Sequence, residues 1–314
     1  MVATIVVGWY GFGSIGAALL TVGGTGFALF CAWQVVTMAL LGICWRTVAP
    51  LGGLGGVGAF VWGRIVRDSA GTCLPFSLVG GFAFGVRAAA VLGISASVAT
   101  LSLVVDLTAE FLAEILFAIL GPPRPAPAID RRVLDQADRH RHRGGARRLR
   151  FDIADAEERG ALFRPVRAQD PRRLVRRPRK RDAPNTELDL AALYGNIGRT
   201  TTCTIGHLAG WLCKGIGNWI AFRLMGADID LVTALAIEAL LHALLIPAFI
   251  VPGYVGVQEV GYAGIGAMFG IPPEISLGVS LLRRARDIAI GVPVLLIWQL
   301  TEMRRLHKSW QPNG

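Results

Sequence analysis

Acidic side chains recur at helical spacing inside an apolar segment. Asp106, Glu110 and Glu114 lie four residues apart between residues 98 and 120. On a helix this spacing puts three carboxylates in one stripe. A charged stripe is costly in lipid, so we expect these groups to line a polar cavity, to share protons, or to pair with Arg87 or with the arginines of residues 283–286. A packed polar seam that only orients helices is the alternative.

Arginines form the second chemical feature, in the middle of the apolar segment 275–300, where Asp287 accompanies them. Inserting four central charges into a membrane costs roughly 12 kcal/mol. The segment has 13 Leu, Ile and Val residues, whose insertion is favourable by only roughly 6 kcal/mol. The charges must therefore face a helix bundle and pair, with Arg283 and Asp287 as the local couple, or lie at the membrane edge between two half-length helices. Both arrangements fit a discontinuous helix. A purely structural cluster at the interface is the alternative.

Histidines provide weaker signals. Glu238 and His242 share one face of an apolar segment, and His207 and Lys214 occur in another. The sequence has no HExxH motif, no Cys/His cluster, no P-loop and no GxSxG motif, and its five cysteines show no CxxC spacing. We therefore expect no metal site, no cofactor and no disulfide framework.

The composition of the chain indicates that apolar, membrane-embedded helices hold these charged side chains in place. The chain has 314 residues, of which 53% are hydrophobic and 17% charged, and its mean hydropathy is +0.51. Soluble domains average about 25% charged residues, so an ordinary soluble enzyme and a disordered chain are both disfavoured. Residues 1–45 contain no Asp, Glu, Lys or Arg, and they predict two helices broken at Gly23–Gly26, the second spanning residues 27–45.

Further helices are expected along both halves of the chain. Residues 51–95 are apolar but interrupted by charges, Pro75 and paired glycines, which predicts a broken or re-entrant pair of helices or one irregular span. In the second half we expect helices at 202–225, at 230–250 with Asp230 as its N-cap, and at 275–300. The predicted fold is all-α, a polytopic integral membrane helix bundle with discontinuous or re-entrant helices.

The net charge of +10 lies in one segment. Residues 121–185 contain 19 Lys and Arg and 9 Asp and Glu, whereas the other residues contain 13 of each. A folded basic surface for nucleic acid is not expected, because the rest of the chain is apolar helix. The positive-inside tendency predicts that this segment and the C-terminus are cytoplasmic. The expected organisation is N-terminal membrane helices (1–120), a basic loop (121–185), C-terminal membrane helices (186–306) and a short tail (307–314).

Three stretches of the second half carry a family resemblance: Pro252–Glu259 (PGYVGVQE), Phe269–Glu274 (FGIPPE) and Leu281–Asp287 (LLRRARD). They resemble the lysylphosphatidylglycerol synthase transmembrane-domain (flippase) family, and with Trp298–Gln299 they are most similar to its hopanoid-associated membrane-protein branch. Leu74–Ser77, Arg87 and Val105–Glu110 are similar to its first half. The likeness covers residues 20–120 and 186–306.

The resemblance implies a bacterial inner-membrane protein that flips or transports polar lipids, with a hopanoid as the cargo in that branch. No soluble aminoacyl-transfer domain follows residue 314 here, so that enzyme activity is not expected. Glycines and Pro252 would break the backbone, Glu259 and Asp287 would be acidic partners, and arginines would hold polar headgroups. The substrate-path candidates from the motifs and from the charged residues together are Arg87, Asp106, Glu110, Glu238, Pro252, Gly253, Gly256, Gln258, Glu259, Arg283, Arg286 and Asp287.

Residues 121–185 depart from the family, whose members carry further apolar helix at this place. The segment is rich in Arg, Pro, Ala and Asp, a composition that resembles GC-rich coding sequence read out of frame. A compensated frameshift and a genuine cytoplasmic loop are the two hypotheses. Translation of the underlying DNA in the other two frames distinguishes them.

Two other function classes stay open. A membrane-embedded enzyme of isoprenoid or phospholipid synthesis would use the carboxylate stripe as acid and base, and a scaffold subunit would need neither chemistry nor transport. The expected partners are membrane lipids, with a second copy of the chain or lipid-synthesis enzymes as further candidates.

Overall fold

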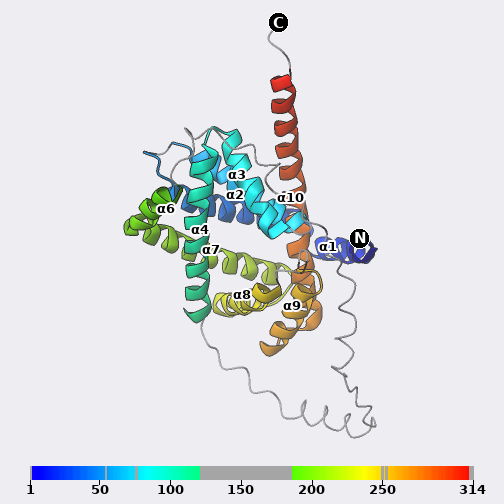
Figure 1. The fold of residues 1–314 in the computed structure, drawn as a ribbon. Helices are drawn as coiled ribbons and strands as arrows, with labels where there is room; N and C mark the ends of the chain where they lie inside the picture. Colours follow the sequence, from blue (N-terminus) through cyan, green and yellow to red (C-terminus); the bar gives the residue numbers. More distant parts are fainter. Residues whose placement is uncertain are drawn as a thin grey trace, which may run out of the picture. The chain divides into compact units, whose positions relative to one another are not determined.

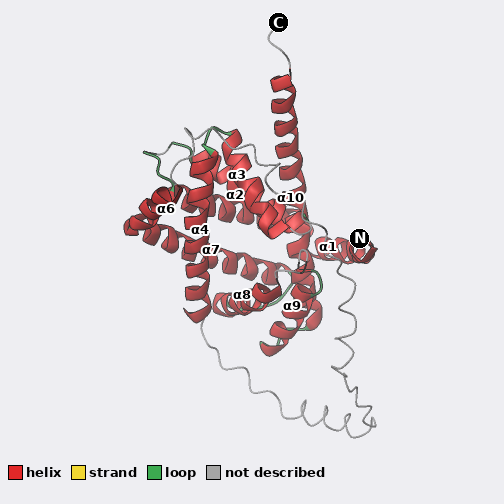
Figure 2. Cartoon of the chain, in the orientation of Figure 1, coloured by secondary structure: helices red, strands yellow, loops and turns green. Residues whose placement is uncertain are grey.

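The computed structural model describes residues 2–53, 55–74, 77–120, 186–248, 251 and 254–310. All regular structure in these ranges is helical (Figure 2), as the sequence predicts. Figure 1 labels the elements, which are α1 (Val2–Val48), α2 (Val57–Cys73), α3 (Ser77–Val91), α4 (Ala96–Leu120), α6 (Thr186–Gly195), α7 (Ile197–Leu224), α8 (Leu231–Leu245), the 3-10 turn η4 (Ile246–Ala248), α9 (Val257–Met268) and α10 (Pro273–Trp310). The basic segment 121–185 lies outside the described residues.

Helix α1 is broken at the predicted position. Gly23 has φ 74° and ψ 160°, a left-handed backbone that glycine tolerates because it lacks Cβ. The part of the helix that follows, Val22–Val48, is long and apolar enough to cross a membrane by its length and composition, and so is Leu231–Ala248. The second of these begins as predicted, because the Asp230 side chain accepts a hydrogen bond of 2.9 Å from the Thr233 N–H. The two apolar helices indicate a membrane protein.

Residues 51–95 form two helices rather than one irregular span. Helices α2 and α3 pack against each other, side by side in Figure 1. Glycines permit this close approach: a Cβ on Gly85 would lie 3.0 Å from the Gly63 carbonyl oxygen and 2.8 Å from the Arg67 Cβ. The expected break between the two helices is therefore present. Their re-entrance into a membrane remains a prediction.

Helix α10 is continuous, although a break within it was predicted. A discontinuity was expected at the charges of residues 283–287, but the helix is unbroken from Pro273 to Trp310 and contains Pro293 in its interior. The charged residues therefore occur within one continuous helix, and the arrangement of two half-length helices is wrong. The remaining alternative is that the charges face other helices and pair. Arg283 and Arg284 pair with acids of other helices, and Arg286 pairs with Asp287.

Helix α7 lies at the centre of the packing, in contact with α1, α4 and α8. One apolar cluster joins Phe222 of α7 to Ile237, Tyr262 and Leu282 of the three helices that follow it. Large apolar side chains also cover the outside, and the most exposed among them are Leu20, Leu29, Ile119, Ile197 and Val260. An apolar exterior around buried polar groups is what a lipid environment requires.

Candidate functional site

The carboxylate stripe of α4 faces two arginines of α2. Glu110 accepts hydrogen bonds from both terminal nitrogens of Arg64, at 2.7 and 3.1 Å, and from Nη2 of Arg67 at 2.6 Å. Arg64 also donates to Asp68 one turn along its own helix, at 2.8 Å. Both guanidinium groups are almost completely buried. This cluster of alternating charges fixes α2 against α4, because each buried charge has an opposite charge within hydrogen-bond distance.

These partners differ from the expected ones. The stripe was predicted to pair with Arg87 or with the arginines of residues 283–286. Arg87 instead donates to Glu302 near the end of α10, and its side chain is half exposed. The true partners, Arg64 and Arg67, interrupt the apolar run of α2 at i, i+3 spacing, which is the sequence signal that could have identified them.

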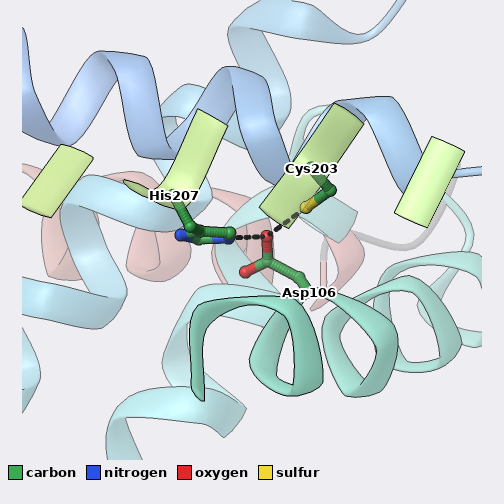
Figure 3. A group of neighbouring side chains, drawn as sticks. All are labelled: Asp106, Cys203 and His207. Carbon is green, nitrogen blue, oxygen red and sulfur yellow. Dashed lines mark hydrogen bonds and ion pairs between the residues drawn. The ribbon is translucent and has the colours of Figure 1, made fainter. Parts of the chain in front are cut away.

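Asp106 joins the same stripe to α7 (Figure 3). One of its carboxylate oxygens, Oδ1, lies 2.8 Å from Nε2 of His207 and accepts a hydrogen bond from the Cys203 thiol at 3.6 Å. The other oxygen, Oδ2, faces Arg67 at 3.4 Å. All three side chains of the group are fully buried. Cys203 is not among the residues predicted for the site, although its spacing of four residues from His207 puts both on one face of a helix.

Carboxylate, thiol and imidazole are also a ligand set for a transition metal. The three ligand atoms lie within 4.8 Å of one another. Two observations oppose a divalent cation at this place: guanidinium nitrogens lie 3.4 and 3.8 Å from Asp106, and Nδ1 of His207 has no hydrogen-bond partner among the described residues. A metal-bound imidazole usually donates its second N–H to an acceptor. The contacts therefore favour a hydrogen-bonded cluster over a metal centre.

A second cluster surrounds Glu238 of α8. The two terminal nitrogens of Arg283 on α10 donate to its two oxygens at 2.6 and 3.2 Å. Arg283 also donates to the hydroxyl of Tyr262 on α9, which donates in turn to Asn218 on α7 at 2.8 Å. Four helices thus contribute to one polar network inside an apolar cluster. The local couple expected between Arg283 and Asp287 is wrong, because Arg283 points to a carboxylate on another helix.

The same carboxylate has a second neighbour on its own helix. His242 lies one turn after Glu238, with Nε2 3.2 Å from Oε1 of the glutamate. On its other side, Nδ1 of His242 lies 3.7 Å from Glu114 of α4. A pocket of about 140 Å³ between α4 and α8 is lined by Glu114 and His242 together with apolar residues such as Ile119 and Ile246. Glu114, the last carboxylate of the predicted stripe, therefore belongs to this second cluster.

The turn before α9 and the first turn of that helix form the third cluster. Glu259 accepts a hydrogen bond from the Gly256 N–H at 2.7 Å and so caps its own helix. Its other oxygen pairs with Arg284 of α10 and accepts from Ser280. Gln258 also donates to the Ser280 hydroxyl, at 2.9 Å. Gln258 and Glu259 of the predicted motif therefore contact α10, and Gly256 contacts Glu259, whereas Pro252 and Gly253 lie outside the described residues.

Arg286 and Asp287 are adjacent in sequence and pair with each other. Nη2 and Nε of Arg286 lie 2.7 and 3.0 Å from Oδ1 of Asp287. The guanidinium group is buried, and its central carbon lies 4.9 Å from the ring centroid of Phe30 on α1. A cation above an aromatic face is stabilised electrostatically. This pair extends the polar part of α10 to the side that contacts α1.

Comparison with known proteins gives one match. Residues 141–294 match the model of the family described as Lysylphosphatidylglycerol synthase TM region. The match supports the family that the motifs of the second half indicate, and its range includes Glu238, Glu259 and Arg286. Residues 20–120, which carry the first half of the resemblance, precede the matched range. A search of curated proteins and a search of solved structures gave no match.

Proposed function

We propose that this protein is a lipid transporter of the flippase type, which moves polar or anionic lipids across a membrane. The observation that carries the proposal is the pairing of three neighbouring arginines on α10. Arg283 and Arg284 pair with acids of α8 and α9, and Arg286 pairs with the acid beside it. The family match to a membrane region associated with lysylphosphatidylglycerol synthase supports a lipid as the ligand.

The proposed chemistry of lipid binding is an exchange in which a lipid phosphate replaces a glutamate carboxylate as the partner of an arginine. An arginine binds a phosphate oxygen pair with the same two-point geometry that it uses for a carboxylate. A headgroup phosphate can therefore replace Glu238 or Glu259 at an arginine without leaving the cation unpaired. The side chains of Arg284 and Glu259 keep about a fifth of their surface exposed, at 21% and 23%, so this pair is the first contact that we assign to an incoming headgroup.

The proposed cargo, membrane and topology are inferred from the family resemblance and from the distribution of basic residues. The hopanoid-associated branch suggests a hopanoid or another polar lipid as the cargo. We place the protein in the inner membrane of a bacterium, with segment 121–185 and the C-terminus in the cytoplasm because both are basic. The helices of residues 51–95 and the turn before α9 would be the re-entrant parts.

Lipid translocation in vesicles tests the proposal. The purified protein is reconstituted with a trace of fluorescent phosphatidylglycerol, and lipid movement between leaflets is followed by quenching of the outer leaflet. We expect translocation to exceed that of protein-free vesicles by at least tenfold. Vesicles with a correctly inserted protein and no increase for any polar lipid would refute the transporter.

The enzyme alternative is less favoured by the contacts. Asp106 and Glu110, its expected acid and base, both face buried guanidinium groups. A catalytic carboxylate that must take up a proton is poorly matched to such neighbours while they stay paired with it. Lipid extracts of a deletion strain distinguish the two classes, because a missing lipid species indicates an enzyme and an intact but mislocalised lipid indicates a transporter.

A further inference from the structure

We propose that Glu238 is a proton-binding site, that Glu114 and His242 form its proton path, and that proton uptake accompanies the binding of an anionic phosphate headgroup at Arg283. This inference deepens the proposed function and rests on it. The observation behind it is an unbroken line of titratable groups, from a pocket between α4 and α8 to a completely buried carboxylate.

The geometry of His242 fits a relay. Its two ring nitrogens face two different carboxylates, Nδ1 toward Glu114 at 3.7 Å and Nε2 toward Glu238 at 3.2 Å. Glu114 and His242 are partly exposed, at 19% and 24%, whereas Glu238 has no exposed surface. The pocket beside them has room for roughly four water molecules at about 30 Å³ each. The outer end of the line therefore opens into this pocket, and the proposal takes water in the pocket as the proton source.

Proton transfer along this line balances at each step. A proton bound to the Glu114 carboxylate passes through one bridging water to Nδ1 of His242, 3.7 Å away, which makes the ring a cation. The ring then gives the proton on Nε2 to Oε1 of Glu238, which becomes a neutral carboxylic acid. The imidazole is left neutral with its proton on Nδ1. The reverse sequence releases the proton to the pocket and restores the starting state.

The charges around Glu238 explain why a headgroup would drive this transfer. In the described state the carboxylate is neutralised by Arg283, which is also held by the Tyr262 hydroxyl. If a phosphate takes Arg283, the carboxylate is left buried without its cation, which is costly unless it takes up a proton. Lys214 of α7 is the other cation near this pair, and its Nζ lies over the Trp211 ring at 3.7 Å.

Among the described residues, the set of titratable and charged groups that face the pair Glu238–His242 comes from four packed helices. Besides the two residues themselves on α8, it consists of Glu114 on α4, Lys214 on α7, Tyr262 on α9 and Arg283 on α10. Four of these six groups are formally charged in the described state: the acids Glu114 and Glu238 and the bases Lys214 and Arg283. The site therefore stays close to neutral only if an added anion brings a proton with it.

The experiment measures proton uptake during lipid binding. The full-length protein in detergent is titrated with phosphatidylglycerol in weak buffer that contains a pH indicator, and with inorganic phosphate in a parallel arm. We expect about one proton taken up per bound lipid, none with phosphatidylcholine, and an affinity for phosphatidylglycerol that rises up to tenfold for each unit by which the pH falls. Proton uptake with inorganic phosphate alone would assign the site to a soluble anion and overturn the lipid inference.

Variants separate the proton site from the path. Glu238→Gln should bind phosphatidylglycerol with no proton uptake and no pH dependence, because the amide resembles the protonated acid. His242→Gln and Glu114→Gln should keep the one-proton stoichiometry but slow the uptake at least tenfold in stopped flow. Asp228→Asn, which alters an exposed pair with Arg223, is the matched control and should behave like the wild type.

The outcomes distinguish this inference from the proposed function. A wild-type protein that binds and translocates phosphatidylglycerol without proton uptake overturns the proton site and leaves the transporter intact. A wild-type protein that neither binds nor translocates any polar lipid overturns the transporter and the proton site together. The wild-type stoichiometry decides the question even if Glu238→Gln does not fold.

Discussion

Glu110 of α4 and Arg64 of α2 form a two-point ion pair, with nitrogen–oxygen distances of 2.7 and 3.1 Å, in which the guanidinium group is almost completely buried. Arg67 donates to the same carboxylate at 2.6 Å. One acid therefore neutralises much of the charge of two buried cations. The pair joins segments 46 residues apart in sequence, and it determines which face of α4 turns toward α2.

Removal of this acid should destabilise the protein strongly. Glu110→Ala leaves Arg64 and Arg67 with incomplete neutralisation in the interior, and the loss of one partner of a buried ion pair typically costs about 3–5 kcal/mol. We expect a marked fall in the midpoint of thermal unfolding in detergent. Asp228→Asn, which removes the exposed partner of Arg223, is the control and should leave the midpoint unchanged. Equal midpoints for both variants would contradict a stabilising role of Glu110.

The effect of Glu259 should be functional rather than structural. Glu259→Gln keeps a side chain that can cap α9 at the Gly256 N–H, because glutamine serves in a capping box as glutamate does. It removes the charge that faces Arg284. We therefore expect normal yield and unfolding midpoint but loss of at least nine-tenths of the lipid translocation rate. Glu259→Ala, which also removes the cap, should lose stability in addition. Wild-type translocation in Glu259→Gln would remove this residue from the lipid path.

Much of the helical architecture was predictable from sequence because it depends on local signals. The break at Gly23 and the N-cap at Asp230 are read from one or two residues whose conformational preference is strong. The continuity of α10 was not predicted, because both arrangements considered for its charges were taken to fit a discontinuous helix. In the structure the partners of Arg283 and Arg284 lie on other helices, which offsets that cost.

The pairing of charges was the part that sequence could not determine. The stripe of acids on α4 was identified correctly, but its partners depend on which helix packs against which face. Arg64 meets Glu110 across 46 residues and His207 meets Asp106 across 101. Spacing along one helix specifies which side chains share a face, and it does not specify the helix that covers that face. The prediction of Arg283 with Asp287 failed for this reason.

Substitutions of Arg286 test whether the planar guanidinium group is needed at this position or whether any positive charge is sufficient. Its guanidinium group makes two contacts with Asp287 and lies over Phe30, geometry that a lysine ammonium cannot reproduce. We expect Arg286→Ala to abolish translocation and Arg286→Lys to retain less than a tenth of it, with both proteins inserted normally. The matched control is Arg223→Lys, at the exposed pair with Asp228. Full activity of Arg286→Lys would show that charge alone is sufficient at this position.

Helix packing predicts a sharp contrast between two glycines. A Cβ on Gly42 of α1 would lie 2.5 Å from the Val61 Cα and 3.0 Å from its backbone nitrogen, so α1 and α2 would have to separate. A Cβ on Gly58 of α2 would meet nothing within 4 Å. We expect Gly42→Ala to destabilise the protein by about 1–3 kcal/mol, the usual cost of overpacking, and to lower the unfolding midpoint in detergent. Gly58→Ala should be neutral or slightly stabilising, since alanine is the better helix former. A midpoint for Gly42→Ala at or above the wild-type value would show that α1 and α2 do not pack this closely in the folded protein.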